Sequence, residues 1–367
     1  MLLPKYGVHL GINAQRVSIN YLQMKIGPFS KLIVFDDFSA TPKYQQLADS
    51  FIRAIDNKKL QLNDMVPSIN EVSSYFEISR DTVEKGYRTL KKQGILGSVP
   101  GKGYFIKSVE TGQSLRIFLM FNKLSAHKKI LYDSLIRALN NKATIDFYIY
   151  HSDLGLFRRI MEANKDKEYD YYVIVPHFTG EGDDAYELLN TIPQGKLILL
   201  DKMVRQVKTP FAAVYENFGH DIFNALREAL PQLGKYPRLK IIFPPNSYYP
   251  IEILEGFINF CTEYAFSYGV VTDIASEEIQ KGEAYINLMD DDLVTLVEKV
   301  VAAGYIVGQD LGIISYNETP LKRIILQGIT TISTDFEVMG AETARVIIDR
   351  SPEQVQVPFS LNLRASL

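Results

Sequence analysis

One stretch of the chain is rich in side chains of the kinds that bond phosphates and base edges. It runs from Pro67 to Phe105 and has the sequence PSINEVSSYFEISRDTVEKGYRTLKKQGILGSVPGKGYF. Guanidinium and ammonium groups bind phosphate oxygens and guanine edges, while amides, hydroxyls and carboxylates bond other base edges. With the start of an earlier helix added, the expected contacts are Lys43, Tyr44, Ser68, Asn70, Ser79, Arg80, Asp81, Thr82, Glu84, Lys85, Arg88, Gly101, Lys102 and Gly103, with Arg80 foremost.

Two short helices would position these side chains. Ser68 can cap the first helix, and Glu71, three residues later, can complete a capping box. Glu77 and Ile78 then form a turn, and Ser79 caps the second helix. In the second helix the apolar residues fall on one face, which leaves the charged face free for a ligand.

A hairpin follows the second helix. Gly94 ends that helix, and strands are expected at Leu96–Val99 and Tyr104–Ile106, joined by a tight Pro-Gly-Lys-Gly turn at residues 100–103. Capped amphipathic helices alone are compatible with any small helical domain. Their combination with a basic hairpin favours a winged helix-turn-helix that reads DNA.

This stretch resembles the GntR family of bacterial regulators, whose signature runs L-P-S-x-R-x-L-A, S-R-x-T-V-x-x-A and G-x-G-x-F. The corresponding segments here are residues 66–72, 79–86 and 101–105. The family often has arginine where this chain has Asn70 and Glu84, both at positions that the resemblance assigns to DNA contact. The resemblance implies a regulator that binds double-stranded operator DNA as a homodimer.

The length and composition predict more than one domain. The charge distribution indicates that only one of these domains binds DNA. The chain has 367 residues and is 46% hydrophobic, enough for two or three cores. Residues 42–107 hold 11 Lys/Arg and 7 Asp/Glu, a net charge of +4, whereas residues 108–367 hold 25 and 34, a net charge of −9. Only the small basic region suits a polyanion.

Other functional classes lack their sequence signals. The single cysteine, Cys261, excludes an internal disulfide and is expected as a packed core thiol in a reducing compartment. No apolar run could span a membrane and no export signal is evident, so we expect a cytoplasmic protein without a membrane partner. The five histidines show no metal-ligand spacing, and no nucleophile elbow, phosphate loop or Schiff-base motif occurs. We therefore expect no metal, cofactor or catalytic residue, and no enzyme.

The N-terminal residues are the hardest to interpret. Met24 is an alternative start, and Leu32–Phe35 is expected as a short strand. A helix is then expected, capped by Thr41 with Pro42 at its first position. The expected boundaries are an N-terminal extension without assigned function at 1–39, the winged domain at 40–107 and a polar linker at 108–114.

After the linker, strand-like and helical stretches alternate, which indicates parallel sheets with crossover helices. Strands are expected at 115–121, 144–150, 171–175, 196–200, 212–215, 239–243, 270–271, 284–287 and 311–316, and helices at 128–140, 154–163, 183–189, 218–230, 250–264 and 291–303. Two such series predict an α/β domain of two lobes over 115–367. Lobe 1 would cover about 115–237 and 334–350, and lobe 2 about 238–330 and 355–367.

This region resembles the sugar-sensing domain of LacI-type regulators, which is similar to periplasmic binding proteins. The resemblance rests on residues 303–318, 328–332 and 339–344. Asn317 and Glu318 stand where the family has two aspartates, and the arginine of the family's R-x-x-G-F motif is replaced by Ile253. The resemblance implies a monosaccharide effector in the cleft between the lobes.

A sugar site needs groups that bond vicinal hydroxyls and an aromatic face for the ring. Such groups at expected strand ends are Asn122, Asp201, Tyr215, Glu216, Asn246, Tyr248, Tyr249, Asp290, Asp291, Asn317 and Glu318, of which Asn317 is the first choice. Structural roles stay open: Asp290 or Asp291 could cap the next helix, the tyrosines could pack, and Asp201 could end a strand in solvent. The sequence thus predicts a repressor relieved by a monosaccharide, the alternative being a sugar-binding module without DNA regulation.

Overall fold

The structure is a computed structural model that describes residues 26–111, 115–140, 142–178, 183–245 and 249–367. The predictions for Met24, Asn246 and Tyr248 concern residues outside these ranges. The chain divides into two compact units. The first comprises residues up to Arg116 with Lys142–Tyr148, and the second comprises Ile117–Asn141 with Ile149–Leu367.

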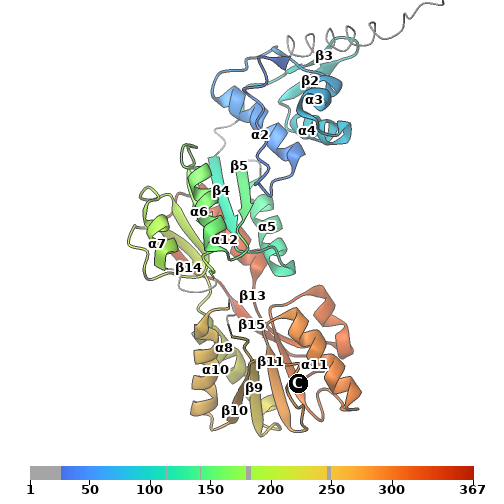
Figure 1. Cartoon of the computed structure of the whole chain (residues 1–367), viewed down its shortest axis with the longest axis vertical. Helices are drawn as coiled ribbons and strands as arrows, with labels where there is room; N and C mark the ends of the chain where they lie inside the picture. The colour runs from blue at the N-terminus through green and yellow to red at the C-terminus, as the bar shows by residue number, and fades with distance from the viewer. Residues whose placement is uncertain (1–25, 112–114, 141, 179–182, 246–248) are drawn as a thin grey trace, which may run out of the picture. The chain divides into compact units, whose positions relative to one another are not determined.

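The first unit contains the predicted winged helix-turn-helix (Figure 1). Ser68 and Glu71 form the predicted capping box, and Ser79 accepts a hydrogen bond from the Thr82 amide. The strands pair antiparallel in the order β1-β3-β2 around a core that includes Phe51 and Tyr87. Its elements are α2 (Lys43–Asp56), β1 (Met65–Val66), α3 (Ile69–Phe76), α4 (Arg80–Lys92), β2 (Leu96–Val99) and β3 (Gly103–Ile106).

Thr41 does not cap α2, contrary to the sequence prediction. Pro42 occupies the N-cap position and makes no side-chain cap. The Thr41 hydroxyl instead donates to the Ile145 carbonyl at 3.1 Å and accepts from the Phe147 amide at 2.9 Å, both in β5 (Ala143–Ile149). The hydroxyl that local spacing assigned to the helix therefore bonds a strand 104 residues away in the sequence.

The short strand expected at Leu32–Phe35 is also absent. These residues run beside α2, where the Val34 amide donates to Ser50 Oγ at 3.4 Å. The Ile33 side chain is 2% exposed and belongs to the winged-domain core. The amides of Leu32 and Ile33 donate to the Phe29 carbonyl, so turn bonds and the Ser50 hydroxyl take the place of a partner strand. The described part of the N-terminal stretch therefore helps to form the core.

The second unit has the predicted α/β architecture with two lobes (Figure 1). The sheet of lobe 1 has the order β14-β8-β7-β6-β4-β5, and that of lobe 2 has the order β10-β9-β11-β12-β13-β15. In lobe 2 the strands pair in parallel except for β15, which is antiparallel to β13. Lobe 1 also contains β4 (Leu115–Phe121), α5 (Ala126–Leu139), α6 (Leu154–Ala163), β6 (Tyr171–Ile174), α7 (Asp183–Asn190), β7 (Leu197–Asp201), β8 (Ala212–Tyr215), α12 (Phe336–Ile348) and β14 (Gln354–Gln356). Lobe 2 contains α8 (Phe218–Glu228), α9 (Leu230–Leu233), β9 (Arg238–Ile242), α10 (Ile251–Glu263), β10 (Ser267–Val271), β11 (Glu283–Asn287), α11 (Asp290–Ala302), β12 (Gly312–Tyr316), β13 (Thr330–Thr334) and β15 (Phe359–Asn362). The predicted end of lobe 1 at residue 237 is therefore wrong, because α8 and α9 pack into the core of lobe 2.

Helices cover both faces of the lobe 2 sheet. Figure 1 shows α8 and α10 on one face and α11 on the other, and a separate apolar cluster lies under each layer. The helices α8 and α10 touch at Gly256, where an added Cβ would lie 2.3 Å from the Gly219 carbonyl oxygen. Glycine is therefore needed at residue 256 for this close helix contact.

Three connections join the lobes. They run from β8 to α8, from β13 to α12 and from β14 to β15. The carboxyl ends of the parallel strands in both lobes lie next to these connections, which is where ligands bind in open α/β sheets. The fold therefore places polar residues at strand ends around one cleft.

Candidate DNA-binding surface and ligand cleft

The outward face of α4 presents the predicted DNA contacts. Arg80, Asp81 and Lys85 are exposed, whereas the apolar side of the helix is buried in the winged-domain core. The Lys85 ammonium lies 4.0 Å from the centroid of the Tyr44 ring. Within the part of the chain that the structure describes, no ion pair involves Arg80, so its guanidinium is available to a phosphate or base.

Several neighbouring groups serve the local structure. Arg88 Nη2 lies 2.8 Å from Glu84 Oε1, and Lys43 Nζ lies 3.0 Å from Asp37 Oδ1. The hydroxyls of the two caps, described above, hold helix starts. Asn70, Gly101 and Lys102 are exposed, whereas Tyr44, Ser68, Thr82 and Gly103 are half-buried. Gly101 and Gly103 have φ values of +77° and +101°, a conformation that favours glycine at the wing tip.

The floor of the cleft in lobe 1 is a buried cluster around Asp201. Asp201 Oδ2 accepts hydrogen bonds from Lys128 Nζ and from His177 Nε2, the latter at 2.7 Å. All three residues are buried, so Asp201 is not a strand end in solvent. No local sequence pattern marks Lys128 or His177 as a partner of Asp201, because only the fold brings the three residues together.

The charges in this cluster compensate one another. Burial opposes ionisation of Asp201, but Lys128 and His177 nevertheless hold the pKa of its carboxyl well below the usual range. Burial lowers the pKa of His177, so its imidazole is neutral at pH 7. Burial and the charge of Asp201 raise the pKa of Glu216 well above the usual range. The cluster therefore contains one cation and one carboxylate, with Glu216 protonated and hydrogen bonded to Asp201.

Oxygen atoms without partners lie at strand ends of both lobes. They are Oδ1 of Asn122, Asn287 and Asn317 and Oε2 of Glu216, none of which is hydrogen bonded to the described chain. Asn317 has a φ of +63°, which asparagine tolerates. Buried acceptors without partners are costly, so a ligand or solvent that donates hydrogen bonds is needed there.

Three of the predicted ligand residues in lobe 2 form ion pairs or hydrogen bonds with other residues of the same lobe. The Glu318 carboxylate pairs with Arg323 at 3.1 Å and with Arg364 at 2.9 Å. Tyr249 donates its hydroxyl hydrogen bond to the Leu288 carbonyl at 2.7 Å, and Asp290 pairs with Lys322 at 2.8 Å. Glu318 and Tyr249 therefore have partners within lobe 2, and a contact of either residue with a ligand stays a prediction.

The suggestion that Asp290 or Asp291 caps α11 is wrong. Met289 occupies the N-cap position of that helix, and both aspartates lie in its first turn. Asp291 is exposed. The first turn still favours both carboxylates, because the helix dipole is positive there.

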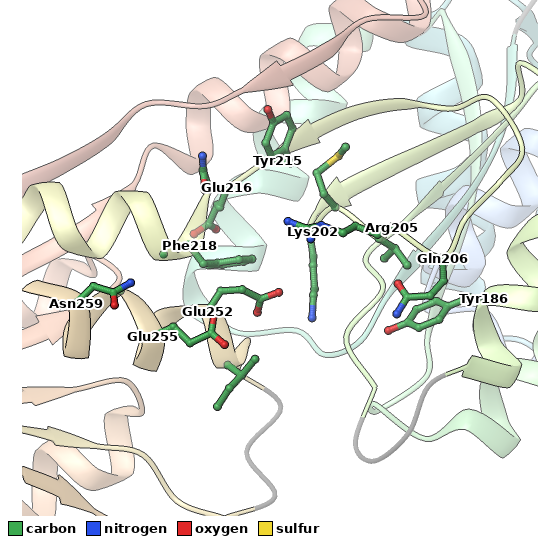
Figure 2. A pocket seen from close by; sticks show the side chains of 16 residues that line it. Tyr186, Lys202, Arg205, Gln206, Tyr215, Glu216, Phe218, Glu252, Glu255 and Asn259 are labelled. Carbon is green, nitrogen blue, oxygen red and sulfur yellow. The ribbon is translucent and has the colours of Figure 1, made fainter.

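A cavity of 570 Å³ lies between the loop that follows β7 and the first turns of α10. Of the predicted ligand residues, Tyr215 and Glu216 line it, whereas Asn122, Asp201 and Asn317 do not (Figure 2). Ile253, at the position of the missing arginine, is fully buried in the apolar core of lobe 2. Lys202, next to Asp201 in the chain, also lines it. The lining residues that the sequence did not single out include Tyr186, Arg205, Gln206, Phe218, Glu252, Glu255 and Asn259.

The described residues contain neither a metal-binding cluster nor a membrane-spanning helix. Over the described ranges, no group of His, Cys, Asp and Glu residues could hold a metal ion. In the same ranges, no helix combines the length and apolarity that a membrane span requires. Cys261 is fully buried, and burial raises the pKa of its thiol to about 12, so it is a core residue.

Known proteins resemble this chain in both its winged domain and its two-lobed domain. Residues 43–106 match the family model "Bacterial regulatory proteins, gntR family". The chain is 21% identical over 345 residues to the arabinose metabolism transcriptional repressor of Geobacillus stearothermophilus, covering 84% of this chain and 90% of that protein.

Solved structures with a similar fold include LacI-type regulators. A LacI family regulator from Lactobacillus casei with bound glucose has a TM-score of 0.56 at 15% identity and covers 69% of this chain and 100% of its own. The lac repressor dimer bound to operator and an anti-inducer has a TM-score of 0.58 at 16% identity, covering 70% and 94%. The chain is therefore a DNA-binding transcriptional regulator with a gntR-family winged helix-turn-helix, followed by a two-lobed domain with the fold of LacI-type regulators.

Proposed function

We propose that the protein is a repressor that binds operator DNA through its winged domain and is released when a monosaccharide binds between the lobes. The observation that carries the proposal is the set of unpartnered acceptor oxygens at the strand ends of both lobes, on Asn122, Glu216, Asn287 and Asn317. The hydroxyls of a sugar would donate to such acceptors. The arabinose metabolism repressor, similar along most of its length, makes arabinose the first candidate effector.

A homodimer would give the protein two recognition helices for two half-sites of an operator. Lobe 2 carries exposed apolar side chains that a second copy could cover. They include Val294, Val301, Leu321 and Ile324, whose exposed fractions lie between 56% and 72%. Burial of exposed apolar side chains favours association. As a regulator of transcription, the protein would act in the cytoplasm.

Regulation requires that the sugar binds more tightly to the form that has released DNA. A sugar that bonds acceptors from both lobes would favour the closed cleft. The three connections between the lobes are the segments that would bend. Operator affinity would then fall in proportion to the sugar's preference for the closed form.

A thermal-shift screen of the full chain against monosaccharides, with L-arabinose first, tests this function. A sugar at 100 times its dissociation constant stabilises the folded state by about 2.7 kcal/mol. The same sugar should release operator DNA in a fluorescence anisotropy assay. Asn317→Ala should remove the thermal shift, whereas Asn224→Ala, which changes an asparagine of α8 away from the strand ends, should retain it. Absence of both the shift and the release with every sugar would refute the proposal.

A further inference from the structure

Four charged side chains line the 570 Å³ cavity from opposite lobes. Lys202 and Arg205 lie on the loop after β7 in lobe 1. Glu252 and Glu255 lie on the first turns of α10 in lobe 2. Figure 2 shows Lys202 and Glu252 extending toward the same space from the two sides.

These four side chains differ from the other charged groups around the cleft. Lys128 pairs with Asp201, and Lys322 pairs with Asp290. In the described part of the chain, no ion pair involves Lys202, Arg205, Glu252 or Glu255. Glu252 Oε2 is buried and has no hydrogen-bond partner there. A carboxylate oxygen that is shielded from water and unpartnered gains most from a cation brought close to it.

The charges of the cavity are balanced. Two cations face two carboxylates, and Glu216, the third carboxyl of the lining, is the protonated member of the floor cluster. The charges of Lys128 and Asp201, in the same cluster as Glu216, compensate each other. A ligand that enters therefore meets no net charge.

This balance discriminates between ligand classes. An uncharged polyol leaves all four charges free to pair with one another when the lobes approach. A phosphate or carboxylate would take Lys202 and Arg205 for itself, and would leave Glu252 and Glu255 unpaired beside an anion. Repulsion of this kind is how a site rejects a ligand that shares most of its attractive contacts.

We propose that the effector is an uncharged polyol, and that Lys202 and Arg205 pair with Glu252 and Glu255 as the lobes close over it, which excludes phosphorylated and carboxylated sugars. The proposal rests on the proposed function, because it specifies the effector of the same cleft. It assigns these four residues to closure and selectivity, and leaves recognition of the hydroxyls to the strand-end acceptors.

Matched ligand pairs test the selectivity. The full chain is titrated by calorimetry with L-arabinose and arabinose 5-phosphate, and with D-glucose and glucose 6-phosphate. We expect the neutral member of at least one pair to bind, and its phosphate ester to bind at least about 100-fold more weakly. A phosphate ester that binds more tightly than its neutral sugar overturns the proposal.

Charge reversal tests the pairing. K202E/R205E and E252K/E255K should each weaken binding of the neutral sugar by about tenfold or more, and the four-residue variant should restore it to within about threefold of the original. Lys208→Glu, on the same loop outside the cavity lining, is the control and should have no effect. Loss in both double variants without restoration would mean that the charges contact the ligand separately, and unchanged affinity in both would mean that they play no part; either result overturns the proposal.

The failure of this inference differs from failure of the proposed function. A neutral sugar that binds and releases operator, with an affinity that neither charge-reversal double variant changes, would show that only the proposed pairing is wrong. If no sugar binds and the operator is never released, the proposed function is lost, and this inference with it.

Discussion

The two functional regions use charge in opposite ways. On α4, Arg80 is exposed and has no ion-pair partner within the described residues, as a side chain that meets DNA phosphates requires. On the floor of the cleft, Lys128 and Asp201 have side chains only 4% and 7% exposed and are paired with each other. A polyanion is bound by free cations at the surface, whereas a small neutral ligand needs a rigid polar frame whose charges are already compensated.

This contrast predicts that charge removal affects stability in the cleft and affinity on the winged domain. Lys128→Met should give the largest effect, because it leaves Asp201 buried without its cation. We expect the free energy of unfolding of the second unit to fall by about 3–5 kcal/mol. Hydrogen exchange of the full chain, followed by mass spectrometry, should show lost protection in α5 and β7 but not in α4.

The neighbouring Lys129→Met is the matched control. Lys129 pairs with Asp133 on the surface of the same helix, and its removal should cost at most about 0.5 kcal/mol. If both substitutions lowered the free energy of unfolding by the same amount, the proposed difference between buried and exposed charges would be wrong.

Asp49 tests whether the winged domain contains any buried charge that resembles those of the cleft. It is 2% exposed, and burial raises its pKa to about 7, although a hydrogen bond from Gln45 and the charge of Arg53 oppose the shift. Above about pH 4 the unfolded chain loses this proton while the folded chain keeps it to about pH 7. The folded state therefore loses stability as pH rises through this window, by up to about 1.4 kcal/mol per pH unit.

Asp49→Asn should remove this loss. Hydrogen exchange of α2 amides in the full chain should show the variant gaining stability relative to the original protein between pH 4 and 7, with a constant difference above pH 7. Asp81→Asn, at an exposed residue of α4, is the control. A difference that does not change with pH would mean that Asp49 is ionised in the folded protein throughout.

Arg80→Ala measures the value of an unpaired surface cation. It should weaken operator binding by about 1–3 kcal/mol and leave sugar affinity and stability unchanged. Arg88→Ala, which removes a cation already paired with Glu84, should cost less. Fluorescence anisotropy with one operator measures both variants, and a larger loss for Arg88 would reverse their order of importance.

Lys102→Ala should have the smallest effect. As a single exposed charge at the wing tip, Lys102 would contact the DNA backbone, so its loss should weaken specific and non-specific binding alike. The salt dependence of log affinity should fall in slope by about 1. An unchanged slope would place Lys102 away from the phosphates.

Sequence reasoning succeeded where the interacting residues are close in the chain. The capping box joins two residues that are three positions apart, and the wing turn has only three residues between β2 and β3. It failed where a distant segment competed for the same group, as at Thr41, whose hydroxyl bonds β5, and at Leu32–Phe35, where the Val34 amide donates to Ser50 of α2. The helix predicted at 218–230 ends at Glu228, because the nitrogen of Pro231 cannot donate the hydrogen bond that would continue α8 into α9.

The order of strands and helices, the charged face of α4 and the polar residues at strand ends were determined by the sequence alone, because periodicity and caps act over a few residues. Only the tertiary structure decided which polar groups meet. Lys128 reaches Asp201 across 73 residues, and Glu318 is paired with Arg364 within lobe 2. Partners of this kind depend on which strands become neighbours in a sheet, and burial then decides which carboxyl keeps its proton.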